Sequence, residues 1–381
     1  MISQIDQTMY RLKNLDSLQQ KLSYQASTGK KLQDGSDDSV LYSRELVVDD
    51  KIRTFEGLKT QIERTKIQNN TSDSTMKEIK NILEYINAEL IKANTDTTSN
   101  DGLKAIALNI AGMKENLYDL ANTQVEGEYV FSGSNSAIKP FEKNSAGEII
   151  YQGDNKLRRV AVEEGSYRER GINGFDSMMY SSSTALKGQD LTFKQNDRII
   201  DQDGNEWKLN SPTNDTLTKY DLDGNVTSET LTPVNLDPAT NTYSVNIPNT
   251  FSNGTKFEAK TTIFNMLDDV INALNKVDSA GNPISDTQSR ELIGKGLENV
   301  KKAFDDVNVA HAELGSKNKI FENSLDRVSS KLTQLNILSQ ELGAANLTEV
   351  AVKAKALELT YTALYSTISK TNQLSLVNFM N

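Results

Sequence analysis

The feature that most constrains this chain is a long heptad repeat in its last third. Across residues 293–342, mostly apolar side chains recur at alternating spacings of three and four residues. Such a period keeps one stripe of a helix facing a partner helix under left-handed supercoiling, so the segment is predicted to be a coiled-coil helix. At about 1.5 Å per residue this helix would be roughly 75 Å long, too long for one compact domain. Its partner must be another long helix of the same chain or of a neighbouring subunit.

Other segments carry a similar apolar stripe. One occupies residues 1–24, and another lies within a helix expected over about residues 37–93, where a polar stretch at 63–75 interrupts it. A further stripe covers residues 103–120, and the last helix is expected over residues 346–381. Because helices with apolar stripes are expected near both ends of the sequence, we predict a helical bundle built from both ends of the chain.

Polar residues mark the register and the boundaries of these helices. Asn69 and Asn318 hold heptad positions, where a buried polar group commonly fixes register at some cost in stability. Ser285 and Gln288 have the spacing of a capping box at the start of the long helix. The heptad register shifts across residues 343–345, which predicts that one helix ends there and another begins.

The middle of the chain has a different pattern. Between residues 128 and 260, short β-branched or aromatic runs alternate with Gly, Asn and Asp, which predicts strands. Asp203-Gly204 and Asp223-Gly224 each lie between two such runs and indicate hairpin turns. We therefore expect a mainly α protein with a β-rich insertion, elongated and divided into several domains.

The expected domains follow from these patterns. Residues 1–35 and 346–381 would be terminal coiled-coil helices, and residues 36–133 with 285–342 would form a helical rod. Residues 134–284 would be the inserted, outward-facing, β-rich domain.

Composition narrows the functional classes. Only 36% of the 381 residues are hydrophobic, as suits thin helical rods that bury a narrow stripe. The net charge of −10 disfavours nucleic acid or an anionic membrane surface as a partner. The first residues lack the pattern of a cleavable secretory signal. Cysteine is absent, which excludes thiol catalysis, thiolate metal sites and disulfides.

No residue pattern predicts a catalytic, cofactor or metal site. His311 is the single histidine and lies on the heptad seam, where packing is the favoured interpretation. Residues 201–205 and 221–225 resemble fragments of calcium loops but lack the closing glutamate, so hairpin turns are favoured. Trp207 is expected to anchor a core. A solvated face is the favoured interpretation of the mixed-charge segment that contains Lys156, Arg158, Arg159, Arg168 and Arg170.

Both ends of the chain resemble the bacterial flagellin superfamily. The resemblance rests on Ser-Thr-Gly-Lys-Lys-Leu at residues 27–32, Gly-Ser-Asp-Asp at 35–38, and the terminal run at 362–376. Within the superfamily, Gly-Glu-Tyr-Val-Phe-Ser-Gly at 127–133 and Tyr-Gln-Gly-Asp at 151–154 are similar to the family of hook–filament junction proteins. The chain departs from flagellin itself after the paired aspartates, where flagellin usually has a longer alanine-rich run.

The resemblance implies a function. A junction protein is a structural adaptor: a ring of copies joins hook-associated protein 1 on the hook side to flagellin on the filament side. It reaches the outside of the cell as an unfolded chain, through the flagellar type III export channel and with an export chaperone. Its terminal helices form the inner layer of the tube, so the expected assembly interface comprises Leu12, Leu22, Leu357, Leu364 and Ile368. The alternatives are a flagellin-type filament subunit, or a secreted adhesin or enzyme whose active part is the β-rich insertion.

Overall fold

The structure is a computed structural model and describes residues 2–95, 98–145, 147–210, 213–238 and 241–380. Side chains are described within these ranges from residue 6 to residue 370. The described chain forms two compact units, each of which is considered by itself. The first unit combines residues 1–60 with 325–381, and the second comprises residues 61–324.

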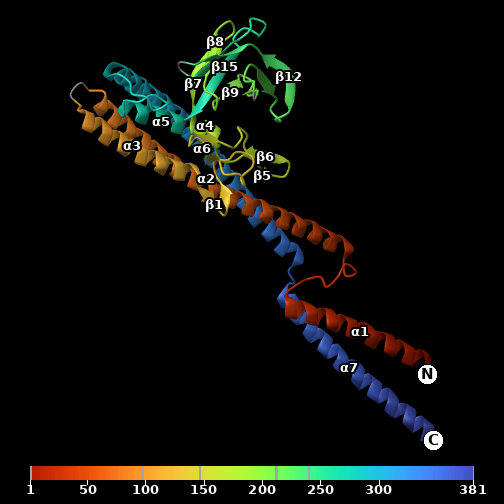
Figure 1. The fold of residues 1–381 in the computed structure, drawn as a ribbon. Helices are drawn as coiled ribbons and strands as arrows, with labels where there is room; N and C mark the ends of the chain where they lie inside the picture. The colour runs from red at the N-terminus through yellow and green to blue at the C-terminus, as the bar shows by residue number, and fades with distance from the viewer. Residues whose placement is uncertain (1, 96–97, 146, 211–212, 239–240, 381) are drawn as a thin grey trace. The chain divides into compact units, whose positions relative to one another are not determined.

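Long helices come from both ends of the chain, as the heptad pattern predicts (Figure 1). The helices are α1 (Ile2–Thr28), α2 (Ser39–Ala93), α3 (Asn100–Ala121), α4 (Gly174–Ser177), α5 (Ile263–Leu274), α6 (Asp286–Gly343) and α7 (Leu347–Met380).

Strands occupy the middle of the sequence. The first six are β1 (Gln124–Val125), β2 (Glu128–Tyr129), β3 (Phe141–Lys143), β4 (Ile149–Tyr151), β5 (Arg159–Glu163) and β6 (Ser166–Glu169), and they pair in sequence as three antiparallel hairpins. The others are β7 (Met179–Leu186), β8 (Asp190–Phe193), β9 (Arg198–Asp201), β10 (Glu206–Leu209), β11 (Leu217–Tyr220), β12 (Val226–Leu231), β13 (Val234–Asp237), β14 (Thr242–Asn246) and β15 (Lys256–Thr262).

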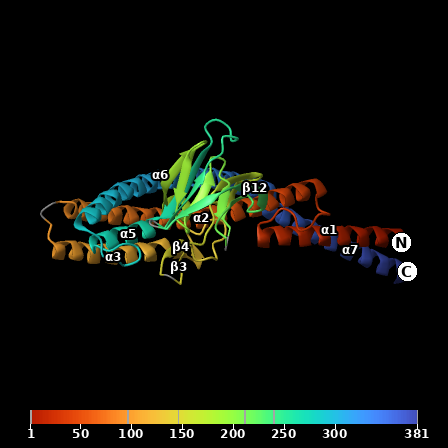
Figure 2. The same ribbon diagram turned by 45° about the horizontal axis from the view of Figure 1, so that its top comes forward.

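The helical part of the second unit is a bundle. Figures 1 and 2 show α3 and α5 running beside the parts of α2 and α6 that belong to this unit. Its core contains the apolar stripes that the sequence predicts, including Met76, Ile79, Leu83, Ile86 and Leu90 of α2, Leu103, Ile106, Ile110 and Leu117 of α3, and Ile293, Val300, Val307 and Leu314 of α6. The three- and four-residue spacing places each stripe on one face of its helix, which explains their burial.

The inserted strands form a second core in the same unit. Strands β12-β11-β10-β9-β15-β7 make a six-stranded sheet, and β13-β14-β8 make a three-stranded sheet. Trp207, Phe257, Phe193 and Tyr243 are buried in the core of these strands. The indole N–H of Trp207 donates a hydrogen bond to Asp201 Oδ2 (3.1 Å), so this buried polar group has a partner. Trp207 is thus the core anchor that the sequence predicts.

Local signals in the sequence are confirmed where they concern turns and caps. Asp201 Oδ1 accepts hydrogen bonds from the backbone N–H groups of Asp203 and Asn205 and closes the β9–β10 hairpin. At the start of α6, the N–H of Ser285 donates to Gln288 Oε1, and the N–H of Gln288 donates to Ser285 Oγ. This reciprocal pair is the expected capping box.

The predicted fold class is confirmed in its main terms, because long helices from both ends flank a β-rich middle. The division into terminal helices, rod and outer domain stays a prediction.

Candidate assembly surface

The terminal helices α1 and α7 pair with each other inside the first unit (Figure 1). Leu22 of α1 is buried against Val350 and Leu357 of α7, and Leu15 and Tyr361 pack against this cluster. The apolar stripe of each helix therefore faces the other helix. Pairing of this kind stabilises helices that would be marginal alone in water.

Backbone hydrogen bonds fix the point where the pair begins. The N–H of Lys31 donates to the carbonyl of Gly343 (2.7 Å), and the N–H of Ala345 donates to the carbonyl of Gly29 (2.8 Å). Gly29 has a φ of 68°, a left-handed conformation that glycine adopts without steric cost. The segment after α1 and the segment before α7 are thus held together, and the register of the two helices is set.

An ion pair also stabilises the segment that follows α1. Lys21 Nζ lies 2.8 Å from Asp37 Oδ1. The hydrogen bond from Lys21, together with one from the backbone N–H of Gln33, lowers the pKa of Asp37 from its ordinary value. The flagellin-like motif at residues 35–38 therefore contributes a carboxylate that ties the loop after α1 back to that helix.

The structure places the predicted interface residues in two groups. Leu22 and Leu357 are brought together in one buried cluster, whereas Leu12, Leu364 and Ile368 are only half-buried. No contact with another subunit is described, so their role in assembly stays a prediction.

The heptad analysis missed a set of exposed apolar side chains on the same two helices. Leu359 of α7 is 64% exposed, although Leu357, two residues earlier, is only 6% exposed. Val352 lies seven residues before Leu359 and therefore on the same face of the helix. Exposed side chains of this kind also include Tyr10 and Tyr365. The sequence signal that could have identified these side chains is the presence of apolar residues outside the main stripe of the helix.

Other residues that the sequence singles out have structural roles. His311 Nε2 lies 3.0 Å from Asp73 Oδ1, a contact between α6 and α2.

In the described parts of the chain, no three His, Asp or Glu side chains are arranged to hold a metal ion. Among the described helices, none is both long enough and apolar enough to cross a membrane.

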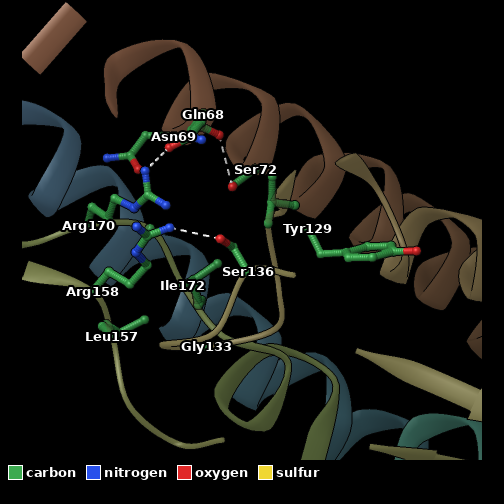
Figure 3. Close-up of a pocket in the computed structure, with 12 residues that line it drawn as sticks. Gln68, Asn69, Ser72, Tyr129, Gly133, Ser136, Leu157, Arg158, Arg170 and Ile172 are labelled. Atoms are coloured by element: carbon green, nitrogen blue, oxygen red, sulfur yellow. Dashed lines mark hydrogen bonds between the residues drawn. The ribbon is translucent and has the colours of Figure 1, made fainter. Parts of the chain in front are cut away.

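The interpretation of the basic segment as a solvated face is wrong for Arg170. Its side chain is only 15% exposed and forms an ion pair with Glu128, Nη2 to Oε2 at 2.9 Å. Arg170 Nη1 also donates to Gln68 Oε1, and Arg158 Nη1 donates to Ser136 Oγ (2.8 Å), as Figure 3 shows. The reason is the polar stretch of α2, which offers hydrogen-bond acceptors on a buried face. Arg159 and Arg168 are exposed, as predicted.

Comparisons with known proteins agree with this geometry. Residues 3–136 match the family described as the bacterial flagellin N-terminal helical region. Over these residues the chain is similar to the N-terminal helical region of bacterial flagellins.

The chain is also similar to flagellar hook-associated protein 3. It is 25% identical over 190 residues to that protein of Salmonella typhimurium, over 47% of this chain, and it spans 56% of that relative's length. The crystal structure of flagellar hook-associated protein 3 from Legionella pneumophila matches with a TM-score of 0.52 and 17% identity, over 78% of this chain and 98% of that one. A putative flagellar hook-associated protein from Vibrio parahaemolyticus matches with a TM-score of 0.53 and 11% identity, over 81% and 100%. These structures share the fold.

Proposed function

We propose that this chain is a structural adaptor of the bacterial flagellum. A ring of its copies would join the hook, through hook-associated protein 1, to the flagellin filament. The observation that carries the proposal is the apolar surface that the paired helices α1 and α7 leave exposed, including Met9, Val352 and Leu359. The similarity to flagellar hook-associated protein 3 supports the assignment to the junction.

The energetics of this surface favour assembly. Burying a large apolar side chain contributes roughly 1.5 to 3 kcal/mol, and a ring repeats each contact at every subunit. Leu22 and Leu357 would hold α1 against α7, so that the pair presents its exposed apolar side chains to neighbouring copies. Those copies would also cover Leu12, Leu364 and Ile368, which the pair leaves half-buried. Exposed apolar surface on a chain with a net charge of −10 suits a protein partner better than nucleic acid or an anionic membrane.

The proposed location is the outside of the cell, in the flagellum. The chain would leave the cell unfolded, through the flagellar type III channel and with an export chaperone. The absence of cysteine suits that route, because an unfolded chain with free thiols could form unwanted disulfides.

Deletion of the gene tests the proposal. We expect cells without it to make hooks and to release unpolymerised flagellin into the medium. A filament subunit presents complementary ends and polymerises without limit, whereas a junction subunit meets a different protein at each end. The purified chain should therefore not grow long tubes, even when seeded with its own aggregates. Micrometre-long tubes, or normal filaments on the deletion strain, would instead identify a filament subunit.

A further inference from the structure

Two polar contacts mark the register between α2 and α6 in the second unit. Asp73 contacts His311 at 3.0 Å, and Lys66 Nζ lies 4.0 Å from Glu322 Oε1. As residue numbers rise along α2 between these contacts, they fall along α6, so the helices run antiparallel. Asn69 lies between the two contacts on α2, and Asn318 lies between them on α6.

Both asparagines have buried amide atoms without a partner in the described parts of the chain. Asn69 is 1% exposed, and neither its Oδ1 nor its Nδ2 has a hydrogen-bond partner. Asn318 Oδ1 is also buried and has no hydrogen-bond partner among the described residues. Buried polar groups in proteins are almost always hydrogen-bonded, to protein or to ordered water. The side chain of Asn69 therefore requires a partner that both donates and accepts.

The neighbouring side chains are already engaged. Gln68 donates from Nε2 to Glu128 Oε2 (2.9 Å), and its Oε1 accepts from Arg170. The hydroxyl of Ser72 donates to the carbonyl of Gln68 (3.0 Å). Figure 3 shows Asn69 next to these groups and close to Arg170. Gln68 and Ser72 are therefore committed to other partners.

A small polar cavity adjoins Asn69. Its volume is about 30 Å³, and Gln68, Asn69, Ser72, Arg158 and Arg170 contribute to its lining. A cavity needs roughly 10 to 15 Å³ on this measure to hold one water molecule, so there is space for at least one. Gly171 closes another side, and a Cβ atom there would lie 3.7 Å from Asn69 Oδ1.

We propose that this cavity is a binding site for ordered water. At least one water molecule would donate to Asn69 Oδ1 and accept from Asn69 Nδ2 or from a guanidinium N–H of Arg158 or Arg170. It would join the α2–α6 seam to the segment after β6, and so help to position the inserted strands on the helices. The cost of placing asparagine on an apolar seam would thereby be offset.

Water fits this site better than a small anion. Arg64, Arg158 and Arg170 leave a local excess of one positive charge over Glu126 and Glu128, which alone would favour a halide. A halide only accepts hydrogen bonds, however, and would leave Asn69 Oδ1 unpaired. Water meets both requirements of the amide.

Crystals of the full-length chain grown in sodium bromide test the site. We expect a density peak within hydrogen-bond distance of Asn69 and of at least one other polar group, without anomalous signal at the bromine edge. An anomalous peak would replace the proposal with a halide site. A cavity without density, in a map that resolves other buried waters, would overturn it.

Two variants test the role of Asn69 itself. In Asn69→Leu the larger apolar side chain should fill part of the cavity and abolish the water peak. Asn70→Leu changes the next residue, which is exposed, and should keep the peak. If Asn69→Leu does not crystallise, Asn69→Ala serves in its place and should also lose the water that contacts the amide. A peak that keeps its position and occupancy in the Asn69 variants would refute the assignment of Asn69 as its partner.

Discussion

Arg170 and Glu128 form an ion pair beside α2, and Gln68 of that helix hydrogen-bonds to both partners. Arg158 also contacts Glu128, at 3.3 Å. Three segments that are distant in sequence, α2, β2 and the end of the β5–β6 hairpin, thus meet at one carboxylate. At the polar stretch of α2, the β1–β2 and β5–β6 hairpins thus contact the helical bundle.

The first prediction concerns the charge of Glu128. Burial alone would raise its pKa, but hydrogen bonds from Arg170 and Gln68 and the nearby positive charges outweigh burial and lower the pKa to about 2. A lowered folded-state pKa stabilises the fold above the unfolded-state value, and this stability is lost as pH falls from about 4.5 towards 2. After allowance for solvent screening, Glu128→Gln should cost about 1 to 2 kcal/mol at pH 7. Urea unfolding at a series of pH values would measure this loss in the free energy of unfolding.

Glu126→Gln is the matched control, because Glu126 pairs with Arg64 but its side chain is 56% exposed. It should change the free energy of unfolding by less than about 0.5 kcal/mol. An equal loss in both variants, or a loss in Glu128→Gln that persists at pH 2, would contradict the role given to the Glu128 carboxylate.

The second prediction concerns Asp197, between β8 and β9. Its ionisation destabilises the fold, whereas ionisation of Glu128 stabilises it. Burial raises its pKa to about 6, and its Oδ1 is buried without a partner in the described chain. The charged form is therefore disfavoured in the fold, and Asp197 lowers stability above its unfolded-state pKa. Asp197→Asn should raise the free energy of unfolding by about 1 to 2 kcal/mol at pH 7. The gain should disappear as pH falls through 6 towards 4.

Asp203→Asn provides the comparison, because Asp203 is exposed in a hairpin turn and Asn-Gly is also a favoured turn sequence. Its unfolding curve should match that of the original chain throughout the same pH series. A gain for Asp197→Asn that does not depend on pH would mean that packing, and not ionisation, is responsible.

The sequence predicted the elements better than their long-range pairing. The heptad seam at 293–342 predicted most of α6, and the capping box placed its beginning correctly, because these signals depend on neighbours within one or two turns. Asp-Gly pairs likewise located two hairpins. That β15 lies between β9 and β7 was not predictable, because side-chain packing across distant segments decides such pairing.

The candidate site shows the same division. Apolar spacing identified Leu22 and Leu357 as members of stripes, yet it could not say that these stripes would face each other within one chain. The buried position of Arg170 was missed because its partners, Gln68 and Glu128, are 102 and 42 residues away in sequence. A mixed-charge segment carries no signal that separates a solvated face from a buried ion pair.

The third prediction separates pairing of the terminal helices from assembly. Leu357→Asp puts a charge into the buried α1–α7 cluster and should cost about 2 to 4 kcal/mol in the stability of that pair. Leu359→Asp alters an exposed side chain and should leave the helix content of the monomer unchanged. It should nevertheless block incorporation into the flagellum. Circular dichroism of the purified chains and motility of complemented deletion cells measure the two effects.

A conservative change at the same position provides the control. Leu359→Met keeps an apolar side chain and should support motility. Normal motility with Leu359→Asp would show that this face of α7 does not contact a neighbour, whereas loss of helix content in Leu359→Asp would point to packing within the chain.

The last prediction concerns the inserted sheets. Ser181 and Lys260 are paired partners in the β7–β15 ladder, so the chain enters and leaves this region at adjacent positions. Replacing residues 182–259 by Asn-Gly should therefore close the ladder with a two-residue hairpin turn. We expect the helical bundle to remain folded, with some loss of stability because Ile200 of the removed region packs against its core. Cells that carry this variant should remain largely motile, since the proposed adaptor contacts lie on α1 and α7.

Swimming assays and electron micrographs of the flagella test whether the variant without residues 182–259 stays motile and which alternative holds if it does not. Normal filaments with lost adhesion or lost activity in the medium would assign the function to the removed sheets, as expected for a secreted adhesin or enzyme. Cells without filaments, despite export of a folded variant, would mean that the sheets themselves contribute to the junction. The proposal requires filaments to persist, because a ring held by its terminal helices keeps its apolar contacts when residues 182–259 are absent.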